Sequence, residues 1–319
     1  MQYSPPIISC LTERLVVLKE VWYLVGESNE ITKSEIVSFL TDKQEIVLFR
    51  NSENEVIAFD AHCSHLGANL KSGRLSTEGI ICPLHQICFQ SNGKSKPSPF
   101  GQYEQKKFKT KERFGSVFVY IGEEPEPVFP DFSLIPENKQ MFETFRTQKV
   151  MATQDAILVN AFDPYHLEFV HKRKLMGSPT LHWDKKNRIL EFLYTSQVIG
   201  YKLSDCIMKW ISKNQIQVRI RSFNGHLFAI ESDLGKVKSQ LLLSLNPFPT
   251  YTLVSGILVQ KKTFPVFNFL RMKLAGFLFR RFLLADLKPL EGMKLQMDHL
   301  KQDSYFRVIA DCLESMKKE

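Results

Sequence analysis

Short apolar runs separated by polar turns characterise the chain between residues 21 and 121. Residues 45–50 and 56–59 are two such runs, and the polar turn at 51–55 between them is typical of a β-hairpin. Residues 21–26 and 115–121 are further strand-like runs at the two ends of this stretch. The pattern predicts a small all-β domain, whose strands would hold their connecting loops rigidly.

Beyond residue 128 the pattern changes to longer strand-like runs and helical segments. One helical segment is predicted over about 156–172, and a helix-rich tail is predicted after Pro265. Many strands followed by helices predict an α+β domain with an antiparallel sheet. The predicted strands of this part are 142–151, 189–199, 216–223, 226–232, 239–246 and 251–260.

A charged, proline-containing segment at 123–127 separates the two patterns and predicts a linker. We therefore expect a lead-in over residues 1–20 that is helical around 11–18, an all-β domain over 21–128 and a second domain over 129–319. The length of 319 residues exceeds the usual size of one domain, which agrees with this division.

Composition and charge narrow the choice of partners. The hydrophobic content of 44% is ordinary for a globular protein, and the net charge is +8. Lys and Arg are scattered along the chain, and no nucleic-acid recognition module is present, so we do not expect nucleic-acid binding. An acidic electron-donor protein is a more economical explanation of the basic charge.

The cysteines show no pairing logic, which favours a reducing compartment. There are six, at Cys10, Cys63, Cys82, Cys88, Cys206 and Cys312. The first six residues lack the charged start and apolar core of a signal peptide, and no charge-free apolar stretch reaches about 18 residues. We therefore expect a cytoplasmic protein without a membrane-spanning helix.

Two short loops each offer one cysteine and one histidine. They are Cys63-Ser-His65-Leu-Gly67-Ala68 and Cys82-Pro-Leu-His85, with sixteen residues between His65 and Cys82. Zinc fingers usually group their ligands as a cysteine pair followed by a histidine pair. One sulfur and one nitrogen from each loop instead suit a two-iron cluster, in which the thiolates hold one iron and the imidazoles the other.

Asn160, Asp163, His166 and His171 form a second candidate site, with separations of three, three and five residues. On one helix the first three would share a face, whereas the two histidines would lie about 140° apart. Bringing both histidines onto one ion needs a distortion such as a π-type turn. Pro164 would disturb the helix, or would serve as the first residue of a helix that starts there. Two imidazoles with one carboxylate form the triad that binds ferrous iron in oxygenases.

The two loops resemble those of Rieske proteins, and the spacing from Asn160 to His171 resembles the motif of the Rieske non-haem iron oxygenases. The resemblance implies a mononuclear Fe(II) bound by His166, by His171 and by an aspartate from a C-terminal helix. It also implies that Asp163 is not a ligand but a bridging acid, which hydrogen-bonds a metal-bound histidine and connects the sites of neighbouring subunits. The ligands that the resemblance implies for a [2Fe-2S] cluster are Cys63, His65, Cys82 and His85.

Four aspartates are candidates for the third ligand of the mononuclear iron. Asp286 is our choice, because residues 282–291 look most like the segment that supplies this ligand in the family. Asp303 is next, and Asp298 and Asp311 remain as alternatives.

The resemblance also implies a fold and an activity. The fold would be an all-β Rieske domain followed by a helix-grip (START-like) catalytic domain with an antiparallel sheet, assembled as head-to-tail homotrimers. Ala68 and Leu84 occupy the positions at which respiratory Rieske proteins carry their disulfide cysteines, so the oxygenases are favoured. Residues 86–88 depart from the family, because Gln86 stands where a glycine is usual, and this could change the cluster potential.

We therefore expect the terminal oxygenase component of a multi-component system, of the alpha-subunit type. Electrons from NAD(P)H would arrive through a flavin reductase, a ferredoxin or both, and O₂ would be the cosubstrate. The enzyme would hydroxylate, demethylate or desaturate a small hydrophobic compound, aromatic or polycyclic. The alternatives are an electron-transfer protein with a degenerate second iron site and a zinc-stabilised interaction module.

Residues 264–284 are unusually apolar but are interrupted by Arg271, Lys273, Arg280 and Arg281. Burial against the sheet or against a neighbouring subunit is the favoured interpretation of this stretch. Shallow contact with a membrane surface, with the basic side chains reaching the headgroups, is the alternative. The stretch could also line a route for an apolar substrate.

Overall fold

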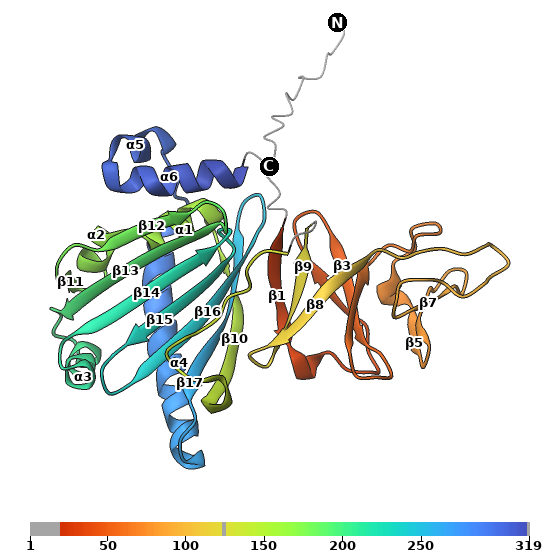
Figure 1. The fold of residues 1–319 in the computed structure, drawn as a ribbon, viewed down its shortest axis with the longest axis horizontal. Helices are drawn as coiled ribbons and strands as arrows, with labels where there is room; N and C mark the ends of the chain where they lie inside the picture. Colours follow the sequence, from red (N-terminus) through yellow and green to blue (C-terminus); the bar gives the residue numbers. More distant parts are fainter. Residues whose placement is uncertain (1–19, 123–125, 318–319) are drawn as a thin grey trace, which may run out of the picture.

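The computed structural model describes residues 20–122 and 126–317, which form two β-rich regions beside each other (Figure 1). We refer to residues 20–122 as the N-terminal region and to residues 126–317 as the C-terminal region. Three sequence-based expectations lie outside the described residues: the helix around 11–18, the environment of Cys10, and the linker at positions 123–125.

The N-terminal region consists of antiparallel strands. Six strands form one sheet in the order β1-β9-β8-β4-β3-β2, and three short strands form a second sheet in the order β5-β6-β7. Short 3₁₀ helices occur at η1 (Ser28–Glu30) and η2 (Leu70–Ser72). The strands are β1 (Val21–Glu27), β2 (Val37–Leu40), β3 (Glu45–Arg50), β4 (Val56–Asp60), β5 (Arg74–Ser76), β6 (Gly79–Ile81), β7 (Cys88–Gln90), β8 (Lys107–Arg113) and β9 (Ser116–Ile121).

Strand β3, next to the edge strand β2, is buried on both faces. Alternate side chains of a strand point to opposite sides, so Ile46 and Leu48 pack in one apolar cluster while Val47 and Phe49 pack in another. The second cluster also contains Cys63 and Cys82. The strand that the sequence predicts most clearly is therefore also the one that supports the two Cys-His loops.

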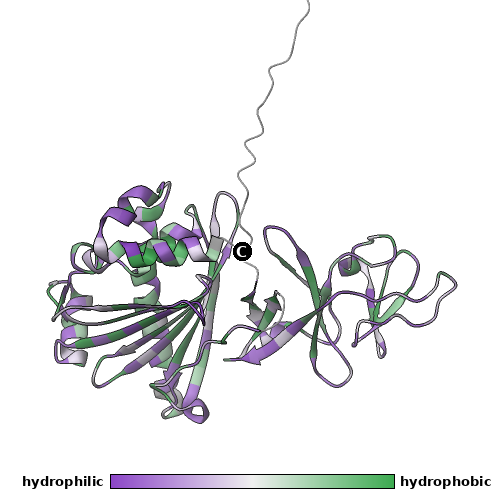
Figure 2. Ribbon diagram, turned by 45° about the horizontal axis from the view of Figure 1, so that its top comes forward, coloured by the Kyte–Doolittle hydropathy of each residue, from purple (hydrophilic) through white to green (hydrophobic). Residues whose placement is uncertain are grey.

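The C-terminal region is organised around one antiparallel sheet of eight strands. Its order is β10-β17-β16-β15-β14-β13-β11, and β12 pairs with β13. Hydrophobic and hydrophilic positions alternate along these strands (Figure 2). The strands are β10 (Gln140–Val150), β11 (Arg173–Leu175), β12 (Thr180–Asp184), β13 (Ile189–Val198), β14 (Ile216–Phe223), β15 (Leu227–Asp233), β16 (Lys238–Pro247) and β17 (Thr252–Lys261).

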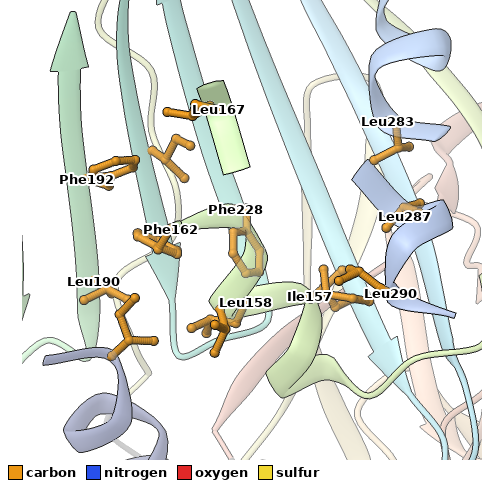
Figure 3. Close-up of a cluster of buried hydrophobic side chains, with 14 of the residues drawn as sticks. Ile157, Leu158, Phe162, Leu167, Leu190, Phe192, Phe228, Leu283, Leu287 and Leu290 are labelled. Carbon is orange, nitrogen blue, oxygen red and sulfur yellow. The ribbon is translucent and has the colours of Figure 1, made fainter. Parts of the chain in front are cut away.

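Helices cover the sheet, and the longest of them, α4, runs across one face of it (Figure 1). The core between sheet and helices includes Phe162, Phe192, Phe228, Leu283 and Leu287, which come from a helix end, from two strands and from α4 (Figure 3). The helical elements are α1 (Gln154–Ala161), α2 (Pro164–Phe169), α3 (Leu203–Ser212), α4 (Pro265–Leu287), α5 (Met297–Gln302) and α6 (Ser304–Lys317), with 3₁₀ turns η3 (Glu137–Lys139) and η4 (Lys288–Leu290).

The two regions share an apolar cluster. Trp22, Leu24 and Phe118 of the N-terminal region pack in it with Leu242 and Ile257 of the large sheet. Polar contacts accompany this packing, since the Leu24 amide donates to Ser244 Oγ at 3.4 Å and Asn246 Nδ2 donates to the Leu40 carbonyl at 3.0 Å. The regions therefore contact each other through buried surface as well as through the chain that connects them.

The structure confirms the predicted α+β class and each long strand predicted in the C-terminal region. The single helix predicted over about 156–172 is wrong, because the chain forms α1 and α2 with a break at Phe162 and Asp163. Asn160, Asp163 and His166 consequently do not share a helix face. Of the two roles considered for Pro164, it takes that of a first helical residue. The sequence patterns also missed α3, the seven-residue strand β8 and the short strands β2, β5, β7, β11 and β12.

The apolar stretch 264–284 forms most of α4, but only one of its faces is covered. Met272 and Leu283 are buried, whereas Leu274 and Phe277 remain largely exposed. The burial favoured for this stretch therefore holds for its inner face only. Within the described part of the chain, no helix is long and apolar enough to cross a membrane.

Candidate metal centres

The two Cys-His loops are closed by the same pair of backbone hydrogen bonds. In the first loop the Cys63 amide donates to the Ala68 carbonyl at 2.9 Å, and the Gly67 amide donates to the Cys63 carbonyl at 2.8 Å. In the second loop the Cys82 amide donates to the Ile87 carbonyl at 2.9 Å, and the Gln86 amide donates to the Cys82 carbonyl at 3.2 Å. The resemblance that the sequence shows between the loops is therefore also a resemblance of backbone structure.

Gly67 and Gln86 occupy equivalent positions in the two loops. Their φ angles are +76° and +56°, in the left-handed region that favours glycine. The Gln86 side chain is held at both ends, because Nε2 donates to the Pro83 carbonyl at 3.2 Å and Oε1 accepts from Arg74 at 3.3 Å. Gln86 thus adopts the backbone conformation of the usual glycine and ties the second loop to β5.

The thiols and the imidazoles of the two loops form separate pairs. Cys63 and Cys82 are buried, with their side chains in hydrogen-bonding contact. The rings of His65 and His85 have centroids 4.7 Å apart. Phe100 lies against both imidazoles, with its ring centroid 5.3 Å from that of His65 and 4.9 Å from that of His85.

This arrangement fits a two-iron cluster better than a single zinc ion. Tetrahedral zinc would bring all four donor atoms close together. Among the described residues, however, only His166, His171 and Asp286 form a group of three or more metal-ligating side chains whose donor atoms all lie within 4.8 Å of one another. Paired thiols beside paired imidazoles match the ligand distribution of a Rieske cluster.

Two further details of the loops suit a bound cluster. His65 Nδ1 is buried and has no hydrogen-bond partner within the described part of the chain, so its lone pair is available to a metal. Burial raises the pKa of the Cys63 thiol, while the backbone amides of His65 and Leu66 act in the opposite direction. Amides directed at a sulfur stabilise a thiolate and tune the potential of a cluster.

The second candidate site begins at a helix that starts on Asp163. The Asp163 side chain accepts from the Tyr165 amide at 2.8 Å, and Pro164 is the first helical residue, which is a favourable position for proline. The helix ends at Phe169, and Lys172 adopts a left-handed conformation with a φ of +54°. His171 thus lies beyond the helix, so it can approach His166 without the π-type turn considered from the sequence.

Asp286 of α4 completes this site. Its Oδ1 lies 2.7 Å from His166 Nε2 and 2.5 Å from His171 Nε2, and the two Nε2 atoms are 3.2 Å apart. Burial alone would raise the pKa of Asp286, but the hydrogen bonds from the two histidines lower it overall. Two imidazoles and one carboxylate thus converge on one point, which is the donor set that binds ferrous iron in oxygenases.

Aromatic residues around the triad were not identified from the sequence. The Phe282 ring stacks on the His171 ring with centroids 3.8 Å apart and an interplanar angle of 13°. Burial and the negative charge of Asp286 raise the pKa of Tyr194 above its usual range. Phe282 precedes Asp286 by one helical turn, so its spacing was a usable signal, whereas Tyr194 reaches the site only through sheet pairing.

The remaining predicted residues lie outside the triad. Among the described residues, Asp163 makes no hydrogen bond to His166 or His171, so the bridging role inferred for it stays a prediction. Asp303 instead accepts from the amides of Tyr305 and Phe306 at the start of α6, at 2.8 and 3.2 Å. Asp298 and Asp311 are exposed.

Tyr305 connects α6 to the break between α1 and α2. Its hydroxyl donates to the Phe162 carbonyl at 2.8 Å. Burial and then the negative charge of Asp163 raise the pKa of Tyr305 above its usual range, which indicates that the two side chains are close. This contact anchors the segment that carries Asp163, and no sequence pattern pointed to it.

A cavity of about 300 Å³ lies between the two regions, away from both candidate metal centres. Glu112 and Arg113 of β8 line it together with Glu137 and Phe142. It belongs to the contact between the regions rather than to either site.

Comparison with protein families identifies residues 21–109 as a Rieske [2Fe-2S] domain. The chain is 29% identical over 215 residues to the cholesterol 7-desaturase nvd of Xenopus laevis, a match covering 64% of this chain and 47% of that protein. It is 28% identical over 166 residues to the aminopyrrolnitrin oxygenase PrnD of Pseudomonas fluorescens, covering 47% of this chain and 45% of that protein. The chain thus spans about half the length of the curated relatives that it matches.

Comparison with solved structures finds proteins whose fold matches nearly the whole chain. The structure of dicamba monooxygenase bound to dicamba superposes with a TM-score of 0.70, covering 95% of this chain and 98% of that one. Sequence identity over this match is 14%, so the likeness concerns the fold. The predicted α+β fold, a Rieske domain followed by an antiparallel-sheet domain, is confirmed.

Proposed function

We propose that the chain is the terminal oxygenase component of a multi-component Rieske oxygenase system. The observation that carries the proposal is the convergence of His166, His171 and Asp286 on one point. An electron-transfer protein with a degenerate second site would have no use for this arrangement. It would also not need a carboxylate from α4 held between two imidazoles that come from a different part of the chain.

We assign the cluster to Cys63, His65, Cys82 and His85, and the mononuclear iron to His166, His171 and Asp286. When bound, the cluster would supply single electrons and the ferrous iron would provide the positions at which O₂ is activated. Asp286 contributes the one negative charge of its site. Phe282 restrains the His171 ring by stacking on it, and Tyr194 stays protonated because burial and Asp286 raise its pKa, so its hydroxyl keeps a proton that it can donate to a hydrogen bond.

We further propose that the working assembly is a homotrimer. Within one chain the loops near β5 and β7 and the site near α2 and β11 lie at opposite ends of the molecule (Figure 1). A neighbouring copy could bring its cluster to the iron site, and Asp163 at the start of α2 would then link the two. The Tyr305 hydroxyl on the Phe162 carbonyl holds this segment in position.

The electron donor in this proposal is an acidic ferredoxin or a flavin reductase that takes its electrons from NAD(P)H. The net charge of +8 favours an acidic partner. Thiolate ligands, together with the five unpaired cysteines among the described residues, favour the cytoplasm as the compartment.

The substrate class that we propose is a small hydrophobic compound, aromatic or polycyclic. Two observations support it: Phe282 forms an apolar wall beside the triad, and one relative is named for the desaturation of cholesterol. The reaction would be a hydroxylation, a demethylation or a desaturation.

A single-turnover experiment tests this function without knowledge of the natural donor. Iron-loaded protein is reduced chemically, freed of reductant and exposed to O₂ with a panel of sterols and aromatic ethers. We expect oxidised product from the native protein and none from His166→Ala, which keeps the cluster. Product formation by His166→Ala at the native yield would contradict the proposal.

A further inference from the structure

The outer face of α4 is apolar although no part of the described chain covers it. At 100° per residue, Leu270, Leu274, Phe277 and Leu284 point within about 40° of one common direction. These side chains are 59%, 49%, 56% and 52% exposed. Met272, Phe279 and Leu283 point the opposite way and pack against the core, so α4 is apolar on both faces while only one face is buried.

The exposed face is also strongly basic. From position 264 to Lys288 the sequence contains five basic residues and a single acid, Asp286, which lies in the metal triad. Arg280, Arg281 and Lys288 are exposed and form no ion pair with any residue that the structure describes. Lys273 is paired with Glu143 at 2.8 Å and stands at the edge of the same face. Apolar side chains therefore alternate with unneutralised cations along this surface.

We propose that the outer face of α4 docks on an anionic lipid bilayer and lies in the plane of its surface. Long apolar side chains would enter the boundary between headgroups and acyl chains, and the arginines and lysines would reach the lipid phosphates. Each basic residue near an anionic surface adds to the free energy of binding, and the burial of apolar side chains adds to it as well. This goes beyond the oxygenase function proposed above and does not depend on it.

Charge decides between a bilayer and a second copy of this chain as the occupant. Two α4 helices packed through this face would enclose Arg281 and Lys288 of both copies in one contact. Like charges in direct contact are unfavourable, and no exposed acid of α4 offsets them. An anionic lipid surface neutralises the cations and covers the apolar side chains at once.

The iron site lies on a different side of α4 from this face. Phe282 is 39% exposed on α4 and stacks on His171. At 100° per residue, Phe282 and Asp286 point about 125° and 165° away from the common direction of the docking face. Docking through the outer face would therefore leave the side of α4 that carries the triad turned away from the bilayer.

Vesicle co-sedimentation of the full-length, iron-loaded protein tests the docking. The probes are vesicles of phosphatidylcholine alone and vesicles that also contain phosphatidylserine. We expect preferential binding to the anionic vesicles. Arg280→Gln combined with Arg281→Gln should weaken it roughly 30-fold, since each basic residue contributes about 1 kcal/mol at such a surface. Leu274→Ser combined with Phe277→Ser should weaken it on the order of 100-fold.

Matched controls carry equivalent changes far from α4. Leu40→Ser removes an apolar side chain of 58% exposure on β2, and Lys185→Gln with Lys186→Gln removes two exposed charges from the turn between β12 and β13. Both controls should bind vesicles as the native protein does. Far-UV circular dichroism and light scattering then establish that the α4 variants keep their fold and their oligomeric state.

Quenching by brominated lipid shows which side chain of the bound protein enters the bilayer. Phe277→Trp should be quenched by brominated phosphatidylcholine in anionic vesicles, and Leu40→Trp should not. The proposal is overturned if native protein ignores both vesicles, if the α4 and control variants bind equally, or if Phe277→Trp is not quenched. It is equally overturned if the α4 variants change the oligomeric state instead, because a second copy would then cover this face.

Discussion

Gln86 offers a sharp test of the loop structure, because it adopts a glycine conformation without being glycine. Its φ of +56° matches that of Gly67 in the other loop. We predict that Gln86→Gly leaves stability nearly unchanged, whereas Gln86→Ala destabilises the protein. At an ordinary position the order would be reversed, since alanine is usually more stable than glycine by about 0.5–1 kcal/mol.

The magnitude follows from three contributions. A side chain in the left-handed region costs about 1–2 kcal/mol, which glycine avoids and alanine keeps. Glycine loses about 0.4–1 kcal/mol through the greater freedom of the unfolded chain. Both variants lose the two side-chain hydrogen bonds of Gln86, to Pro83 and from Arg74, worth about 0.5 kcal/mol each at this exposed position. Glycine should therefore exceed alanine in stability by roughly 0.5–1 kcal/mol.

Thermal unfolding of the cluster-loaded variants provides the measurement. Far-UV circular dichroism reports the fold, and the visible absorbance of the cluster reports the loops. We expect the Gln86→Gly midpoint close to the native one and the Gln86→Ala midpoint lower by about 2 °C for a chain of this size. The reduction potential should stay the same in Gln86→Gly, because the backbone amide of residue 86 keeps its bond to the Cys82 carbonyl. An alanine variant as stable as the glycine variant would refute the loop conformation described here.

Three further predictions concern buried polar groups and the link between the sites. Burial lowers the pKa of His226 from 6.5 to about 3, so the unfolded chain takes up a proton that the folded chain does not. The free energy of unfolding should therefore decrease as the pH is lowered from about 6.5 to 3, by up to about 1.4 kcal/mol per pH unit. His226→Leu should flatten this slope in urea titrations. Glu231 is buried and accepts from Ser133 and Arg221, so Glu231→Ala should cost about 3 kcal/mol in chemical denaturation, and a cost below about 1 kcal/mol would count against this network. Asp163→Asn should leave all metal bound but slow the oxidation of the reduced cluster during turnover, and an unchanged rate would argue against a bridging role.

Local patterns in the sequence were sufficient for the long strands and for locating the two Cys-His loops. Period-2 alternation and short apolar runs predicted β3 and β13 to β17, because each of these strands has at least one buried face. The Cys-His loops were identified from residue type and spacing alone. Short strands such as β5 and β7 were not predicted, because three residues are too few to show an alternation of apolar and polar positions.

The helix around His166 was predicted incorrectly from the local sequence pattern. The helical period continues through Phe162, but the Asp163 side chain caps a new helix and Pro164 begins it. Asp and Pro at these positions are strong start signals, so the break could have been preferred over a continuous helix. The placement of His171 depends on the left-handed Lys172, and that residue type gives no warning of such a conformation.

Contacts between distant segments were out of reach for a different reason. Asp286 lies 115 positions beyond His171 and Tyr305 lies 143 positions beyond Phe162, and both pairs meet only once the sheet has formed. The family resemblance supplied Asp286, and the spacing of Phe282 from Asp286 was a signal that could have been used, whereas nothing in the sequence supplied Tyr305. For residues 264–284 the sequence favoured burial, since an apolar helix is usually buried on all sides in a soluble fold, and an exposed face was only the alternative.

The number of iron atoms per chain tests the central claim, a cluster and a separate mononuclear iron, most directly. Metal analysis of fully loaded protein, combined with electron paramagnetic resonance of the reduced cluster, should find three irons per chain. Asp286→Ala should lower the count to two and leave the resonance of the cluster intact, while Asp303→Ala should keep all three. Two irons in the native protein, or three in Asp286→Ala, would contradict the account.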